Sequence, residues 1–450
     1  MKLHSQSRHP RRGDRADGAA GFRRAWARLV GRATMPSLPR RRGRKPRVPL
    51  TQVLAALTFH VMQDIGTLGE HFETLFGDGL SDSSCSDRRT RLPWVIFADL
   101  MQRVLRPKAA VRRHPDAFWR GWRLVAIDGT QFSLTNTPQV HATTRKARTR
   151  RGRAAFAKIT TTVLLELGLH NPLAAAIGRD DESEWALAKQ LLAHVPTRAL
   201  LLADRLYGCG AFAATAWAAC TAVGSHFLIR ARTEIKVGVI HVLNDGSRLV
   251  LVPVHDPEHP HRVIEWLHLR EVRVQVGRRG HRATSVRLWT SLLDPDEAPA
   301  LEVAELYARR WEHELYYREV KRVLRKSDVL QSHTPETGAQ EIAAIVLASA
   351  ILAEERARAA TGDVPALRVS FARVLNVAKA IWLAVDLGHG VLSDQQINII
   401  VQRGYARMRQ YATPKRRSRS CPRAVRRPVT KWPRLMKPNS IEEPLEFTIR

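Results

Sequence analysis

Acidic residues and cysteines are both scarce in this sequence. Asp and Glu number 42 against 73 Lys and Arg, which leaves a formal net charge of +31 at pH 7. A surplus of this size favours a polyanionic partner, and nucleic acid is the first candidate. The 4 cysteines form no Cys-x-x-Cys pair, which argues against a disulfide framework or a zinc knuckle and fits a reducing compartment.

Long apolar runs are missing as well. The nearest candidate, residues 342–352, is shorter than a membrane span and continues directly into charged residues, so we expect a buried helix and no membrane partner. The first long apolar stretch begins after Pro49, so we expect no signal peptide. The Arg-rich N-terminus is also typical of an organellar transit peptide, but Asp14 and Asp17 weaken that interpretation.

Apolar residues make up 44% of the 450 residues, enough for two or three domains with a sizeable core. Composition and periodicity divide the chain into a basic disordered arm (1–48), a helical N-terminal domain expected to bind DNA (49–115), an α/β core in two parts (116–232 and 297–345), a β-rich insertion between those parts (233–296), C-terminal helices (346–410) and a basic tail (411–450). Arg88, Arg89 and Arg91 would give the helical domain a basic edge, although a solvated charged face is the commoner explanation of such a cluster.

Two apolar runs of the core each lead into an aspartate. The run RLVAIDGT reads as a buried strand that ends at Asp128, and RALLLADR repeats the theme with Asp204 and the adjacent Arg205. A third strand, SHFLIRAR, ends in basic residues that include Arg230. Because the ends of strands are where a sheet presents chemical groups, we expect both aspartates to belong to a functional site.

The β-rich insertion alternates apolar and polar residues between the turn sequences NDG, DPEHPH and GRRG. One of these loops brings His255, His259 and His261 close together. Their spacing matches no standard set of metal ligands, so a solvated loop is the better interpretation.

The stretch from Tyr307 to Lys321 contains neither Pro nor Gly and predicts one continuous helix. At about 100° per residue, one sector of roughly 60° on this helix contains Tyr307, Arg310, Glu314 and Lys321. The two other glutamates, Glu312 and Glu319, point away from that sector. The simplest explanation is an ordinary ion pair of Arg310 with Glu314, which would contribute only a few tenths of a kcal/mol.

Asp128, Asp204 and Glu314 together suggest more than a surface ion pair. A trio of carboxylates with water and phosphate oxygens is the ligand set that Mg²⁺ prefers. Two such ions can activate the attacking oxygen and stabilise the leaving oxygen of a phosphoryl displacement, while nearby Arg and Lys residues hold the polyanion.

These residues resemble those of the DDE transposases of bacterial insertion sequences. Within them, the insertion-sequence-four group carries a Tyr-Arg-Glu-Lys signature, and the intervals between residues 307, 310, 314 and 321 match it. The Asp-Gly-Thr at 128–130 and the Ala-Asp-Arg at 203–205 resemble the two aspartate motifs of that group. Members of that group also carry a β-rich insertion before the last acid. The resemblance runs from about residue 40 to residue 440.

The resemblance implies an RNase H-like (retroviral-integrase-like) α/β core, which is a five-stranded mixed sheet flanked by helices, with helical regions on both sides in the sequence. It implies that Asp128, Asp204 and Glu314 bind two Mg²⁺ ions, with Mn²⁺ as a substitute. It further implies cut-and-paste transposition, in which the protein binds the element ends, nicks a strand and transfers the 3′-hydroxyl to DNA.

The partners implied are double-stranded DNA, as inverted-repeat ends and as target, and a second copy of the chain in a synaptic complex in the bacterial cytoplasm, associated with the nucleoid. The candidates for DNA contact are Tyr307, Arg310, Lys321, Arg205, Arg230 and Trp289. Trp266 is a second candidate for stacking on DNA, and a buried sheet tryptophan is the better interpretation of either residue.

Two other functions stay open at this point. A metal-dependent nuclease on the same fold would need the same three acids but would not transfer strands. A DNA-binding relic that has lost catalysis would not need them, so the presence of Asp128, Asp204 and Glu314 argues against it.

Overall fold

The computed structural model of the chain describes residues 21–37, 48–77, 79–138, 140, 148–149, 152–153, 156–179, 182–277, 284–327, 329–414 and 446–449. Most of the predicted basic arm (1–48) and most of the predicted basic tail (411–450) therefore lie outside the described residues. The helices are α1 (Gly21–Val30), α2 (Leu50–His60), α3 (Leu68–Phe76), α4 (Asp82–Arg91), α5 (Val95–Val104), α7 (Glu184–Leu191), α8 (Gly210–Ala222), α9 (Ala300–Tyr307), α10 (Trp311–Arg318), α11 (Pro335–Ala359), α12 (Phe371–Gly388) and α13 (Asp394–Arg409).

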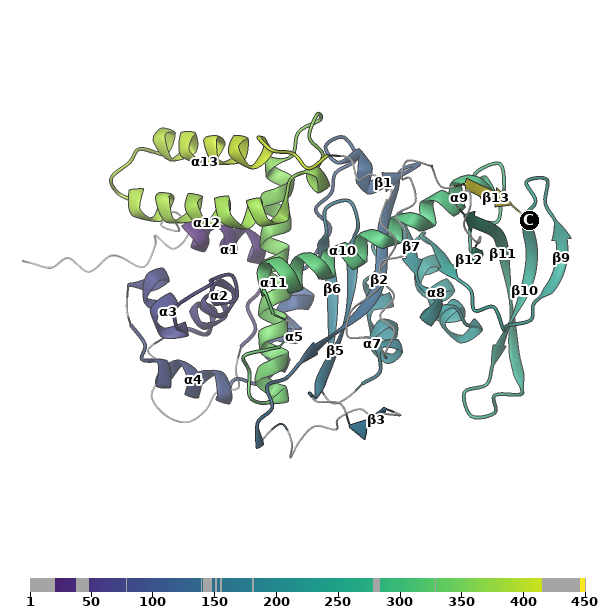
Figure 1. The fold of residues 1–450 in the computed structure, drawn as a ribbon, viewed down its shortest axis with the longest axis horizontal. Coiled ribbons are helices and arrows are strands. Elements are labelled where there is room, and N and C mark those ends of the chain that lie inside the picture. Colours follow the sequence, from purple (N-terminus) through teal and green to yellow (C-terminus); the bar gives the residue numbers. More distant parts are fainter. Residues whose placement is uncertain are drawn as a thin grey trace, which may run out of the picture.

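The strands are β1 (Phe118–Trp119), β2 (Trp122–Ser133), β3 (Arg148–Thr149), β4 (Gly152–Arg153), β5 (Lys158–Glu166), β6 (Asn171–Gly178), β7 (Ala199–Ala203), β8 (His226–Arg230), β9 (Gly238–Val242), β10 (Arg248–His255), β11 (Val263–Gly277), β12 (Thr284–Thr290) and β13 (Glu446–Ile449). Figure 1 shows a helical region on the left, the central sheet, and the strands β9 to β12 on the right, with the long helix α11 between the helical region and the sheet.

The central sheet has the strand order β6-β5-β2-β7-β8. β7 lies parallel to both β2 and β8, whereas β5 is antiparallel to β2 and to β6. This mixed five-stranded arrangement with helices on both faces confirms the predicted RNase H-like core. β12 pairs with β8, and β11, β10 and β9 follow in turn, so the β-rich segment extends the same sheet.

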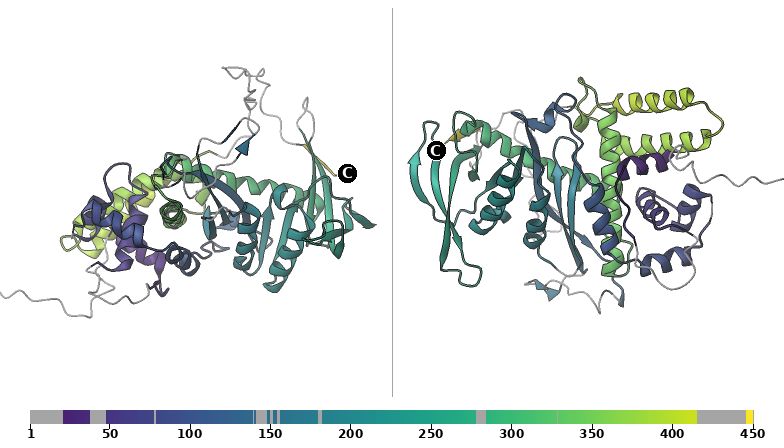
Figure 2. Two further views of the ribbon diagram at one scale, coloured as in Figure 1. Left: turned by 90° about the horizontal axis from the view of Figure 1, so that it is seen from below. Right: turned by 180° about the vertical axis from the view of Figure 1, so that it is seen from behind.

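Alternation along β2 sends its side chains into two separate apolar layers. Leu124 and Ala126 pack in the layer that includes α9 and α11, whereas Val125 and Ile127 pack in the layer that includes α7 and α8. In the left view of Figure 2 the teal helices α7 and α8 lie below the sheet and the green helical segments run along its other side. Even-numbered residues of this part of β2 therefore face the layer of α9 and α11, and odd-numbered residues face the layer of α7 and α8.

β2 is longer than the sequence predicts. Its pairing with β7 ends at Ile127 and Ala203, but its pairing with β5 continues to Ser133. Asp128 is thus not the end of a strand. It is the first residue of β2 that has lost its parallel neighbour, which opens the sheet at that point.

The helical segment that carries Glu314 is less regular than predicted. α9 ends at Tyr307, a 3₁₀ turn covers Ala308–Arg310, α10 follows, and a π-helical segment covers Glu319–Leu324. Because a π turn spaces its hydrogen bonds more widely than an α turn, the rotation of 100° per residue does not hold as far as Lys321.

The predicted disordered arm contains a helix, which corrects that expectation. In α1, Phe22, Ala25, Trp26 and Leu29 are buried. Phe22 contacts Phe59 of α2 and Trp382 of α12. The helical spacing of these apolar residues was hidden among arginines, and only contact with distant helices makes the segment fold.

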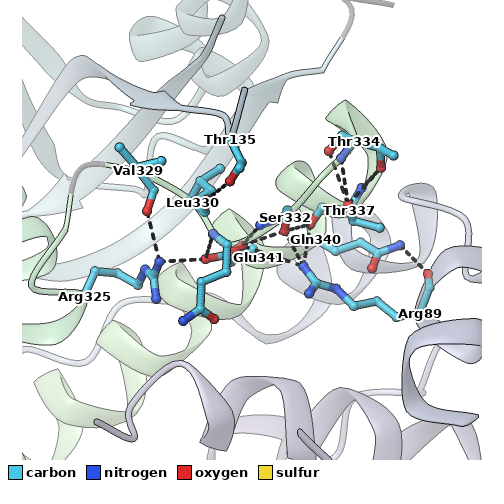
Figure 3. Close-up of polar contacts among 11 residues, drawn as sticks. Arg89, Thr135, Arg325, Val329, Leu330, Ser332, Thr334, Thr337, Gln340 and Glu341 are labelled. Carbon is cyan, nitrogen blue, oxygen red and sulfur yellow. Dashed lines mark hydrogen bonds and ion pairs between the residues drawn. The ribbon is translucent and has the colours of Figure 1, made fainter. Parts of the chain in front are cut away.

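Arg88 and Arg89 do not form a basic edge, because both guanidinium groups turn inward. Arg89 Nη2 donates to Ser332 Oγ at 2.6 Å and to the Thr337 carbonyl at 2.7 Å, and it lies 3.8 Å from Glu341. Glu341 in turn pairs with Arg325 at 2.9 Å. Figure 3 shows this polar joint, in which α4, the segment that follows the π helix and the start of α11 meet.

α11 is long and apolar enough, by length and composition, to cross a membrane, yet 94% of its most apolar window is buried inside the fold. Its buried length fits the core helix that the sequence predicts. Near the C-terminus, β13 pairs with β11 through Val274–Gly277, so the end of the predicted basic tail forms a strand of the sheet.

Candidate active site

Asp128 projects from β2 toward the layer of α10. Its side chain is 14% exposed, and its Oδ2 lies 3.3 Å from Nη1 of Arg310. Burial raises the pKa of the Asp128 carboxyl to about 7, with Arg310 opposing that rise and the charges of Asp204 and Glu184 adding to it. The positive charge of Arg310 therefore does not offset the effect of burial and of the neighbouring carboxylates on the Asp128 pKa.

Asp204 follows β7 directly and begins the 3₁₀ turn Arg205–Tyr207. Its Oδ1 accepts a hydrogen bond from the Leu206 amide at 2.7 Å, which fixes the side chain at the end of the strand. β7 is the parallel neighbour of β2, and Asp204 acts electrostatically on Asp128 and on Tyr307. The two predicted aspartates thus lie on adjacent parallel strands and influence each other electrostatically.

Glu314 reaches the same place from α10. Arg310 Nη2 donates to Glu314 Oε1 at 2.9 Å while Nη1 contacts Asp128, so one guanidinium lies between the two carboxylates. The ion pair that the sequence offered as a simple explanation exists, but it also includes Asp128. Two acids from a strand and a helix therefore converge on a single cation.

α10 is held over β2 by hydrogen bonds from its inner face. Tyr317 donates its hydroxyl to the Asp128 carbonyl at 2.7 Å, and His313 Nε2 lies 3.0 Å from the Val163 carbonyl. Burial lowers the pKa of His313 to about 3, so the ring is neutral and donates from Nε2. These contacts hold Glu314, one residue after His313, on the side of Asp128 where Arg310 bridges the two.

The remaining acids of the helix serve a different purpose. Glu312 and Glu319, which the sequence predicted to point away, lie 3.0 Å and 2.6 Å from the ring nitrogens of His170. Arg356 of α11 also pairs with Glu319 at 3.2 Å. This buried network, which we call the His170 anchor, fixes the helix from beneath.

The predicted DNA-contact residues lie at different depths around the carboxylates. Burial raises the pKa of the Tyr307 phenol to about 12 against the opposing charges of Arg310 and Arg230. Lys321 Nζ donates to the Gln131 carbonyl at 2.6 Å, beyond Asp128 on β2. Arg205 is exposed and pairs with Glu234 at 3.1 Å.

Trp289 does not lie at this surface, which corrects its candidacy for stacking on DNA. It is fully buried in the layer of α8, and its indole nitrogen donates to Glu271 at 3.2 Å. Trp266, by contrast, is 52% exposed. The two residues lie on different strands: Trp289 is in the part of β12 where both faces are covered, whereas Trp266 is near the start of β11, where most residues are exposed.

Glu184 is a carboxylate of this region that the sequence analysis missed. It is the first residue of α7, and the Tyr207 hydroxyl donates to its Oε1 at 2.8 Å. Burial raises the pKa of Glu184, the Tyr207 hydrogen bond opposes that rise, and Asp204 adds to it. The sequence carried no spacing signal for it, since EWALAKQLLAHV reads as an ordinary amphipathic helix.

The donor chemistry fits a divalent ion. Asp128, Asp204 and Glu314 offer hard carboxylate oxygens, and the guanidinium of Arg310 already occupies a position between two of them. Across the part of the chain that the structure describes, no three His, Cys, Asp or Glu side chains are close enough to hold an ion as they stand. An ion at Asp128 or Glu314 would compete with Arg310 for the same carboxylate oxygens.

Comparison with known proteins gives a consistent set of similarities. The family model of the transposase DDE domain matches residues 119–351, just over half of the chain. Transposase InsG for insertion sequence element IS4, from Escherichia coli (strain K12), is 30% identical over 237 residues, which are 52% of this chain and 52% of that protein. The putative transposase InsZ of the same organism is 30% identical over 129 residues, 28% of this chain and 43% of that protein.

The chain thus spans about half the length, or less, of these curated relatives. Among solved structures, the piggyBac transposase synaptic complex with hairpin DNA aligns with 92% of this chain and 89% of that chain, at a TM-score of 0.40 and 10% identity. The two folds agree only loosely.

Proposed function

The chain belongs to the DDE transposase family, and from that premise we propose that it catalyses metal-dependent cut-and-paste transposition of a bacterial insertion sequence. The match to the IS4-element transposase confirms the predicted place in the insertion-sequence-four group. Under this proposal the chain binds the ends of the element, nicks DNA there and joins a 3′-hydroxyl to target DNA.

The observation that carries the proposal is the position of Arg310. Its guanidinium lies between Asp128 of β2 and Glu314 of α10, and Asp204 stands at the end of the adjacent strand. Two of these three carboxylates, from a strand and a helix, thus pair with one positive charge, and the third follows the neighbouring strand. Such an arrangement suits a polyanionic substrate that arrives together with divalent cations.

We propose that Asp128, Asp204 and Glu314 hold Mg²⁺ ions, with Mn²⁺ as a substitute. When bound, such ions lower the pKa of an attacking water or hydroxyl and neutralise charge on the phosphoryl oxygens. The chain itself orients the DNA: Arg310, once released from the carboxylates, and Tyr307 beside it would contact phosphate oxygens near the cleaved bond.

Lys321 and the exposed Arg205 extend the same cationic surface on either side of Asp128 and Asp204. Its partners would be double-stranded DNA, first as inverted-repeat ends and then as target. By the same family resemblance we propose a homodimer in a synaptic complex, acting in the bacterial cytoplasm on nucleoid DNA.

The test is cleavage of a labelled duplex that carries the terminal inverted repeats flanking the gene, with and without Mg²⁺. We expect nicking at the repeat boundary that needs Mg²⁺ and that Glu314→Gln removes. Glu305→Gln is the matched control, because Glu305 is an exposed glutamate of the same helical run. A second duplex with a pre-cleaved end measures strand transfer.

Two outcomes would contradict the proposal in different ways. A duplex that the protein binds but never cuts, with Mg²⁺ or with Mn²⁺, would leave a DNA-binding relic. Cleavage without joining of the pre-cleaved end would leave a nuclease.

A further inference from the structure

The residue beside Asp128 lacks a side chain, and a carboxylate from another element fills that space. A Cβ atom added to Gly129 would lie 2.2 Å from Cδ and 2.6 Å from Oε1 of Glu184. Gly129 lies in β2 without a left-handed φ, so its backbone conformation does not require glycine. The glycine of the Asp-Gly motif is therefore needed for close approach rather than for a turn.

Glu184 approaches Asp128 through the opposite face of the sheet. Side chains alternate along β2, so Asp128 faces α10 while the bare position 129 faces α7. α7 begins at Glu184 because Ser183 caps it, with its hydroxyl accepting from the Ala186 amide at 3.2 Å. This cap fixes the direction in which the Glu184 side chain leaves the helix.

Tyr207 ties the same carboxylate to the second aspartate. The phenol is fully buried and donates to Glu184 Oε1 at 2.8 Å. It lies at the end of the 3₁₀ turn that Asp204 begins. Glu184 therefore touches both aspartate motifs, at Gly129 on one side and through Tyr207 on the other.

We propose that Glu184 is a positioning residue of the active site, which sets the separation of the Asp128 and Asp204 carboxylates and adds the negative charge that helps retain divalent ions. This inference rests on the proposed function only in naming the ions. Its geometric part, the contact of Glu184 with Gly129 and Tyr207, stands without it. Glu184 acts through the two aspartates and is not itself placed on the reacting phosphate.

The decisive measurement is calorimetric titration of the full chain with Mn²⁺, in the absence of DNA. We expect Glu184→Gln to weaken Mn²⁺ binding about tenfold, as losses in the supporting shell of a metal site do. Tyr207→Phe should produce a smaller loss in the same direction. In a Glu184→Ala background, Tyr207→Phe should cause no further loss, because residue 184 then has no side-chain acceptor for the Tyr207 hydroxyl.

A second measurement tests the space beside Gly129. Gly129→Ala should lower both the melting temperature and Mn²⁺ affinity, because the new methyl group overlaps the Glu184 carboxylate. In a Glu184→Ala background the same substitution should no longer lower the melting temperature, since the overlapping atoms are gone. Equal effects of Gly129→Ala in both backgrounds would overturn the proposed contact.

Cleavage of the inverted-repeat duplex adds a third readout. For Glu184→Gln we expect the Mg²⁺ concentration at half-maximal rate to rise about tenfold, the rate at saturating Mg²⁺ to recover, and DNA binding to stay unchanged. Glu305→Gln, the exposed control, should leave all of these values unchanged. If Glu184→Gln lowers the melting temperature but leaves the Mn²⁺ affinity unaltered, Glu184 has a purely structural role and the inference is overturned.

The two proposals fail in distinguishable ways. If the unaltered chain binds Mn²⁺ but never cleaves DNA, the proposed function fails, while the difference in Mn²⁺ affinity between the chain and Glu184→Gln still decides the role of Glu184. If the chain cleaves DNA and Glu184→Gln matches it at every Mg²⁺ concentration, the inference alone fails.

Discussion

Two groups of buried carboxylates differ in how completely their charge is balanced. Burial alone would raise the pKa of Glu319, but Arg356 and His170 outweigh it and lower that pKa to about 2. Glu271 likewise has a lowered pKa, because Arg287 and Arg273 outweigh its burial. At Asp128 and Glu184 burial wins and the pKa of each carboxyl is raised.

Acids with a lowered pKa stabilise the fold, whereas those with a raised pKa lie at the candidate active site. In the His170 anchor and in the joint of Figure 3, each acid is paired with a positively charged group inside the chain. Around Asp128, within the residues that the structure describes, the guanidinium of Arg310 is shared between two carboxylates. Because positive charge is lacking at this position, bound cations from outside the chain would neutralise the carboxylates there.

The largest expected effect is at Asp128. Asp128→Asn removes a ligand and should lower the cleavage rate at least about 10⁴-fold, which corresponds to about 5 kcal/mol in the barrier, while DNA binding survives. The exposed Asp363→Asn is the control and should cleave normally. Rates come from the labelled inverted-repeat duplex. If Asp128→Asn abolished DNA binding as well as cleavage, Asp128 would not act only as a metal ligand.

The same substitution should have the opposite effect on the metal-free fold. The folded pKa of Asp128, about 7, lies above the usual aspartate value of 3.8, so the ionised carboxylate opposes folding once the pH exceeds about 4 and does so fully above about 7. Asp128→Asn should therefore raise the melting temperature at pH 8 and leave it nearly unchanged at pH 4. A lower melting temperature at pH 8 would show that Asp128 is already neutralised.

The next effect concerns the His170 anchor. His170→Gln leaves Glu312 and Glu319 without their shared cation and should lower the free energy of unfolding by about 3 kcal/mol. The raised pKa of His170 makes its contribution complete below pH 6.5 and lost as the pH rises through the folded value. The lowered pKa of Glu319 makes its contribution complete above pH 4.5 and lost as the pH falls toward 2.

The difference between His170→Gln and the unaltered chain should thus be greatest between pH 4.5 and pH 6.5 and should shrink at high pH. Urea unfolding at pH 5.5 and at pH 9 measures it, with His194→Gln, at an exposed position, as control. A difference that grows toward pH 9 would exclude a charged imidazole at residue 170.

A smaller effect is expected at the joint. Arg89→Met leaves the acceptors at Ser332 and Thr337 without this donor and should cost about 1–3 kcal/mol. Because the Arg89 guanidinium is held inside the joint by Ser332 and Thr337, the salt dependence of DNA binding should not change. Arg91→Met, whose side chain is 75% exposed, should leave stability unchanged. A shallower salt dependence of DNA binding for Arg89→Met would show that Arg89 contacts DNA, as a basic edge of the helical domain would.

The smallest effect is expected at Arg205. Arg205→Ala removes an exposed cation and should change stability by less than about 0.5 kcal/mol. It should weaken binding to all duplexes alike and reduce the slope of log affinity against log salt by about 1. Glu234→Gln, which removes only the partner of Arg205, should leave that slope intact or steepen it. An unchanged slope for Arg205→Ala would remove this residue from the proposed DNA surface.

The sequence predicted those parts of the site that local pattern controls. Apolar runs leading into Asp128 and Asp204 identified two strands, which the structure pairs in parallel, and the spacing of Arg310 and Glu314 placed both on one side of a helix. The same local rules misjudged α1, where the apolar face is short and surrounded by arginines. They also treated the arginines of α4 as a surface cluster, because nothing within α4 reveals the acceptors that lie far along the chain.

By itself, the sequence determined the excess of positive charge, the mixed α/β pattern and the order of the acids, since each follows from composition, periodicity or spacing. Only the tertiary structure decided which charges meet. Glu184 comes to the empty side of Gly129, Arg310 bridges two acids, and Trp289 turns inward because β2 and β12 each present alternate residues to different layers. Such pairings join residues far apart in the chain, and no local pattern encodes them.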